Sequence, residues 1–120
     1  MGNFRELKVW QLAKEIAVDV YRVVDLNEKL KGDYRLKAQI TSSAVSVPSN
    51  IAEGDELSTI KHGINHLYIA KGSCAELITQ LIIAKELNLI EEKKADELIS
   101  KCNHVSIMLY KLIQARNNFK

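Results

Sequence analysis

The sequence contains one proline, five glycines and two cysteines among its 120 residues. Proline and glycine most often break helices and form turns, so their scarcity predicts a few long elements joined by short connections. The two cysteines, Cys74 and Cys102, are too few and too far apart for a zinc ribbon or a CxxC motif. Both fall on apolar positions of helical patterns, which predicts buried, free thiols.

A strong excess of charge of one sign is also lacking. The chain has 17 Lys and Arg against 15 Asp and Glu, a formal net charge of +2. Nucleic-acid-binding proteins often carry a strong basic excess. The excess of +2 is too small to decide whether this chain binds nucleic acid, although binding through a local basic patch remains open. The rest of the composition, 47% hydrophobic and 27% charged residues, is typical of a folded protein. The length predicts a single domain over residues 1–120.

Long hydrophobic runs are absent as well. No stretch approaches the roughly 20 apolar residues that a membrane span needs, so no membrane segment is expected. The first residues, MGNFRELKVWQ, contain no apolar run after a basic start, and this argues against a signal peptide. We therefore expect a soluble, cytoplasmic protein.

Helical periodicity dominates what is present. Apolar residues recur at three- and four-residue steps in four segments, at residues 4–26, 34–53, 60–89 and 92–114. The third segment carries a heptad seam, formed by Ile60, Leu67, Cys74 and Leu81 with Ala70, Leu77 and Ala84. No strand-like alternation of useful length occurs. The pattern predicts an all-α fold, an antiparallel up-and-down four-helix bundle.

The connections carry helix start and stop signals. Residues 27–32 are polar and end in glycine, which indicates a loop. Asp33 is expected to cap the second helix, and Ser58 or Thr59 the third. Gly54 is expected to end the second helix, because glycine readily adopts the left-handed conformation that closes one.

Pro48, the only proline, lies inside the second segment. It removes one intrahelical hydrogen bond, but the residues before it are small, so a neighbouring helix can approach closely. We therefore expect the second helix to continue with a kink at Pro48. Asn50 and Glu53 follow, and two interpretations stay open: solvent-facing residues at a helix end, or a structural polar cluster tied to a basic group on an adjacent helix or subunit.

Three stretches together resemble a known family: FRELKVWQLA, AVSVPSNIAEG and IAKGSCAEL. They resemble the small four-helix-bundle proteins encoded in the intervening sequences of bacterial 23S ribosomal RNA genes, over nearly the whole chain. The motif residues that carry the resemblance, and that it implies are structural, are Trp10, Pro48, Asn50, Glu53, Gly54, Gly72 and Ser73.

The resemblance implies a bundle that assembles into a ring, typically a pentamer. A related group, the accessory proteins of diversity-generating retroelements, shares this bundle and binds nucleic acid, but its members look strongly basic. The chain departs from the family at Leu57, where a basic residue is frequent, which weakens any phosphate contact at that loop. Gly63 and His66 stand where aromatic residues are frequent, which indicates local repacking.

Metal and catalytic chemistry find little support. His62 and His66 are four apart on one helix face, but a third ligand would have to come from Glu53, Asp55 or Glu56. The Ser73–Cys74 pair lies about two helical turns (~11 Å) from His66, too far for a nucleophile and its base. We expect no metal site, no cofactor and no enzymatic activity.

Basic residues cluster between the first two long segments. Lys29, Lys31, Arg35 and Lys37 could contact phosphates while Tyr34 stacks on a base. Glu28 and Asp33 dilute this cluster, so a mixed-charge solvated loop remains the competing interpretation. Two functions follow: a homo-oligomer that binds structured RNA through a basic rim, or a scaffold that docks a partner polypeptide through Trp10 and the small-residue face at residues 42–46.

Overall fold

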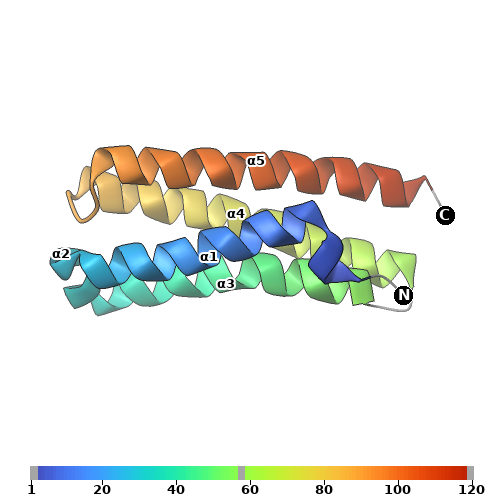
Figure 1. The fold of residues 1–120 in the computed structure, drawn as a ribbon, viewed down its shortest axis with the longest axis horizontal. Helices are drawn as coiled ribbons and strands as arrows, with labels where there is room; N and C mark the ends of the chain where they lie inside the picture. Colours follow the sequence, from blue (N-terminus) through green and yellow to red (C-terminus); the bar gives the residue numbers. More distant parts are fainter. Residues whose placement is uncertain (1–2, 57–58, 119–120) are drawn as a thin grey trace.

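The structure is a computed structural model that describes residues 3–56 and 59–118. Its described residues are helical or in short connections, with no strand, so the predicted all-α class is confirmed. A 3-10 turn, η1 (Phe4–Glu6), precedes five α-helices. These are α1 (Lys8–Leu26), α2 (Glu28–Gly32), α3 (Tyr34–Glu56), α4 (Ile60–Glu86) and α5 (Glu92–Asn117). Figure 1 shows the four long helices lying lengthwise, with α2 at one end.

The segment at residues 27–32 is not the loop that its polarity suggested. Residues Glu28–Gly32 form the short helix α2, and its Leu30 side chain is almost completely buried. One apolar side chain in an otherwise polar stretch is too weak a signal for a helix, but it anchors this turn to the core. The Asp33 cap is confirmed, because its carboxylate accepts a hydrogen bond from the Leu36 amide at 3.1 Å.

The α4–α5 connection is placed close to where the pattern breaks. α4 ends at Glu86, three residues earlier than predicted, and Asn88 has a left-handed φ of 59°. Thr59 caps the start of α4, since its hydroxyl accepts from the His62 amide at 3.3 Å. The alternative cap, Ser58, and the departure at Leu57 lie outside the described residues.

Pro48 lies inside α3, which continues on both sides of it, so the proline does not end the helix. The predicted end at Gly54 is wrong. α3 runs through Gly54 to Glu56, and no described glycine has a positive φ. The lack of a side chain at Gly54 serves a close helix contact: a Cβ built there would lie 2.8 Å from the carbonyl oxygen of Gly63.

The core is one continuous cluster of side chains. α4 packs against α3 and α5, and α1 packs against α3 and α5 as well. Cys74 and Cys102 are buried and free, as predicted. They line an apolar cavity of about 10 Å³, which also touches α1 and α3. Burial raises the pKa of Cys74 to about 11 and that of Cys102 to about 12.

One described helix, α4, is long and apolar enough by length and composition to cross a membrane. Only 39% of that apolar window is buried inside the fold. A core helix of a soluble bundle passes the same test. Apolar side chains therefore remain on the outer side of α4, among them Tyr68, Ile69, Ile82 and Ile83.

Candidate functional site

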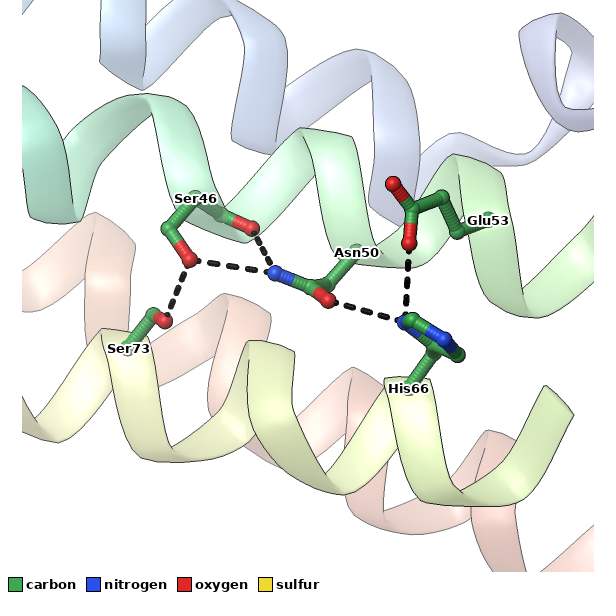
Figure 2. A network of polar contacts seen from close by, with 5 residues as sticks. All are labelled: Ser46, Asn50, Glu53, His66 and Ser73. Carbon is green, nitrogen blue, oxygen red and sulfur yellow. Dashed lines mark hydrogen bonds and ion pairs between the residues drawn. The ribbon is translucent and has the colours of Figure 1, made fainter. Parts of the chain in front are cut away.

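A polar network joins α3 to α4 on one side of the molecule, close to Pro48 (Figure 2). The hydroxyls of Ser46 on α3 and Ser73 on α4 are 2.8 Å apart. The side-chain nitrogen Nδ2 of Asn50 donates to the Ser46 backbone carbonyl at 2.9 Å and to the Ser46 hydroxyl at 3.1 Å. These contacts tie together two of the motif residues, Asn50 and Ser73.

His66 of α4 completes the network. Its Nδ1 lies 3.0 Å from Asn50 Oδ1 and 3.0 Å from Glu53 Oε2, both from α3. Since the Asn50 nitrogen faces Ser46, its oxygen faces the ring, and both neighbours of Nδ1 are acceptors. Nδ1 must therefore carry the proton. Asn50 and Glu53 thus bond to a basic group on an adjacent helix, which favours the polar-cluster interpretation over two unbonded residues at a helix end.

The network is arranged to hold helices together. Within the described residues, neither serine hydroxyl bonds to His66, so the network contains no nucleophile paired with a base. His66 is about 29% exposed and Glu53 about 61%, so their pairing is weakened by solvent. The serine pair at the other end is the more protected contact, since Ser73 is 4% exposed and Ser46 is half-buried.

The small-residue face at residues 42–46 is used within the chain. Ser43 and Ala44 are buried, and Ser46 bonds to Ser73. This side of the face therefore brings α4 close to α3, whereas Ser42 and Val45 of the same stretch are exposed. Trp10 is half-buried and packs edge-on against Phe4, with ring centroids 5.2 Å apart.

A second polar contact, which the sequence analysis did not predict, joins the ends of α3 and α5. Arg116 Nη2 donates to Asp55 Oδ1 at 2.7 Å, and Nη1 donates to the Gly54 carbonyl at 3.3 Å. The Asp55 side chain is only 5% exposed, and its Oδ2 has no partner among the described residues. One signal was available: Asp55 follows Ile51 by four residues and so shares its buried helix face.

The two histidines considered for a metal site do not gather further ligands. Among residues 3–56 and 59–118, no group of three or more His, Cys, Asp or Glu side chains could hold a metal ion. His62 is exposed on the first turn of α4, while the Nδ1 of His66 is engaged by Asn50 and Glu53. The arrangement therefore uses His66 as a helix-pairing residue.

The predicted basic cluster lies at the end of the molecule formed by α2 and the start of α3 (Figure 1). Lys29, Lys31 and Arg35 are exposed, Lys37 is half-buried, and Tyr34 is 80% exposed. Lys31 pairs with Asp25 at 3.3 Å, which leaves it partly neutralised. Four cations and an exposed aromatic ring at the same end of the molecule are the groups that phosphate contact and base stacking require.

A depression of about 400 Å³ adjoins this cluster. It is lined by the α1–α2 junction, including Leu26 and Lys29, and by residues 88–92 of the α4–α5 connection. Three carboxylates line it, from Glu28, Glu91 and Glu92. These would repel phosphate, so the anion-attracting surface is the Lys and Arg side of this end and not the depression.

Two other motif residues differ in their surroundings. Gly72 is exposed on α4, and a Cβ built there would meet nothing within 4 Å. Pro48 is buried in α3. The contact with Gly63 within the same chain explains why residue 54 is a glycine. No contact within the chain explains why residue 72 is one.

Comparisons with known proteins identify the family and a structure of similar fold. The model of the 23S rRNA-intervening sequence protein family matches residues 5–111. A crystal structure of a protein of unknown function from the S23 ribosomal protein family of Bacteroides thetaiotaomicron VPI-5482 has a similar fold, with a TM-score of 0.76 and 23% identity. The match covers 88% of this chain and 97% of that one. No curated protein matches the chain. The family match over most of its length shows that this chain belongs to the 23S rRNA-intervening sequence protein family.

Proposed function

We propose that the chain is a non-enzymatic, cytoplasmic homo-oligomer that binds structured RNA through the basic end formed by α2 and the start of α3. The observation that carries this proposal is the juxtaposition of Tyr34, 80% exposed, with four cations from Lys29, Lys31, Arg35 and Lys37. An exposed aromatic ring leaves apolar surface in contact with water, which is unfavourable unless a ligand covers it. Nucleic-acid bases are among the planar groups that stack on such a ring. The surrounding cations attract the phosphates of the same ligand.

The proposed subunit is an antiparallel up-and-down bundle of four long helices with α3 bent at Pro48. The short connections and the lengthwise alignment of α1, α3, α4 and α5 in Figure 1 support the bundle. The bend follows from the chemistry of proline, which lacks an amide proton and crowds the carbonyl of Ala44.

Assembly is supported by apolar side chains on the outside of all four long helices. The large ones that are at least 39% exposed include Val18, Tyr21, Val45, Tyr68, Ile69, Ile82, Ile83, Ile107 and Tyr110. Surfaces of this kind favour contact with other chains. A ring of five copies is the form that the family resemblance implies. Repetition of a weak basic patch around an assembly strengthens RNA binding without any new contact.

Fluorescence anisotropy of the purified assembly with a structured ribosomal RNA stem and a matched DNA duplex tests this proposal. We expect binding to the RNA stem that weakens steeply as salt is raised, because phosphate neutralisation releases counterions. Absence of binding at low salt would remove nucleic acid from the function. In that case the competing function, a scaffold that docks a partner polypeptide, would take its place.

A further inference from the structure

The outer face of α4 carries a second seam, separate from the seam that packs into the core. Its eight residues follow one another at alternating steps of four and three: Lys61, Asn65, Tyr68, Gly72, Ala75, Thr79, Ile82 and Glu86. Every one of them is exposed. The six inner residues are uncharged. Alternating steps of four and three are the spacing at which one helix packs lengthwise against another.

The seam has the same spacing in both directions. Read from its midpoint, between positions 73 and 74, Gly72 corresponds to Ala75 and Tyr68 to Thr79. Farther out, Asn65 corresponds to Ile82, and Lys61 to Glu86. A second α4 laid antiparallel on the first would therefore meet it in register along the whole seam. Small residues stand at the centre, and nothing lies within 4 Å of a Cβ built on Gly72, so two helices can approach closely there.

The two ends of the seam carry opposite charges. In the antiparallel arrangement Lys61 of each copy meets Glu86 of the other, which gives two ion pairs related by a two-fold axis. Among the described residues neither side chain forms an ion pair within its own chain. Charge complementarity thus identifies a second copy of this chain as the occupant of the face.

Both charges are also placed against the preference of α4 itself. Lys61 lies in the first turn and Glu86 is the last residue of the helix. The helix dipole favours acidic residues at the start and basic residues at the end. The charges that end the seam therefore do not serve the isolated helix, whereas they do serve an antiparallel pair.

We propose that the outer face of α4 binds the same face of a second copy, antiparallel, about a two-fold axis that passes between positions 73 and 74. This inference rests on the proposed homo-oligomer and names its contact. It requires an even number of copies. A pair forms if this is the only contact between subunits, and ten copies form if it joins two rings of five.

Charge reversal tests the contact with the full chain, by native mass spectrometry and sedimentation across a concentration series. Lys61→Glu and Glu86→Lys each replace two attractions by repulsions, and we expect each to raise the Kd of the two-fold contact about tenfold. The double variant restores opposite charges across the axis and should return the Kd to the wild-type value. Both single changes suit the dipole of α4, so loss of assembly cannot come from a weakened helix. Lys14→Glu, at an exposed position of α1, is the matched control.

A steric variant gives an independent readout. Ala75→Arg places a long cation beside the axis and should halve the number of copies, while Ala38→Arg, on the exposed side of α3, should not. Circular dichroism verifies that both variants keep their helices. A wild-type monomer would overturn this inference together with the homo-oligomer. An assembly with an odd number of copies, unchanged in number by Lys61→Glu and Ala75→Arg, would overturn the α4 contact alone and leave the homo-oligomer in place.

Discussion

Gly54 of α3 and Gly63 of α4 meet backbone to backbone, so that a Cβ on Gly63 would lie 2.5 Å from the Gly54 carbonyl oxygen. A glycine inside a helix normally costs about 1 kcal/mol relative to alanine. Here the closeness of the two helices reverses that preference, because backbone atoms cannot move aside as a flexible side chain can. The same Gly54 carbonyl accepts from Arg116, so three helices converge at this point.

Gly63→Ala should lower the free energy of unfolding by about 1–3 kcal/mol, the usual cost of overpacking a close contact. Urea denaturation followed by circular dichroism measures the change. Gly32→Ala, at the end of α2, is the matched control, since a Cβ there meets no neighbour. It should be neutral or stabilising by up to about 1 kcal/mol. Equal effects of the two substitutions would contradict the Gly54–Gly63 contact.

Arg116→Ala should destabilise the chain by roughly 2–3 kcal/mol, because it leaves the Asp55 carboxylate buried without its cation. The figure lies below that for a fully buried pair, since Arg116 is 25% exposed. Lys31→Ala breaks the exposed pair with Asp25 and should cost less than about 1 kcal/mol. If thermal unfolding shows the two variants to be equally stable, the Asp55–Arg116 contact is not the anchor that its burial indicates.

Asn50→Ala should lower the free energy of unfolding by about 1–3 kcal/mol. Asn50 connects Ser46 to His66, and its removal leaves these part-buried groups without their hydrogen-bond partner. A double-mutant cycle of Asn50→Ala with Ser73→Ala measures how far the network acts as a unit. We expect a coupling free energy above about 0.5 kcal/mol. Strict additivity of the two substitutions would show that the serine pair and the histidine are independent.

The buried thiols predict a loss of stability at alkaline pH. Burial raises the pKa of Cys74 from 9.0 to about 11 and that of Cys102 from 9.0 to about 12. Above pH 9 the unfolded chain therefore releases protons that the folded chain retains, so the free energy of unfolding falls as pH rises from 9 toward 11–12. Each thiol contributes a slope of up to roughly 1.4 kcal/mol per pH unit.

The double variant Cys74→Ala/Cys102→Ala isolates this effect from tyrosines and lysines that titrate in the same range. Its stability should depend less steeply on pH than that of the wild type between pH 9 and 11, whatever the cost of the cavity it creates. Parallel pH profiles for the two proteins would show that the thiols are not protected by the fold.

Much of the fold could be predicted because periodicity reports which residues face the core. The all-α class, the cap at Asp33 and the buried cysteines all follow from local patterns. The sequence alone could not reveal α2, which depends on one buried leucine, Leu30. Glycine suits both a left-handed turn and a close helix crossing, and the sequence pattern led us to assign Gly54 to a turn at the helix end. Only the position of Gly63 in the fold shows that the crossing is the correct role.

The candidate site was less predictable for a similar reason. Spacing within α3 placed Asn50 and Glu53 together but could not say that His66 faces them from α4. The Asp55–Arg116 pair joins positions 61 residues apart, and Arg116 lies beyond the last periodic segment, at residues 92–114. Contacts between helices depend on how far each helix is rotated and shifted along its neighbour, which a single periodic pattern does not determine.

The most direct test of the RNA-binding proposal is the salt dependence of RNA affinity in wild type and in a Lys29→Glu/Arg35→Glu variant. If the α2–α3 end contacts phosphates through its four cations, log K for an RNA stem should fall against log salt with a slope of about −3 or steeper. The variant should bind far more weakly and with a shallower slope, while Lys111→Glu on α5 should match the wild type. An unchanged affinity and slope in the Lys29→Glu/Arg35→Glu variant would contradict the proposal.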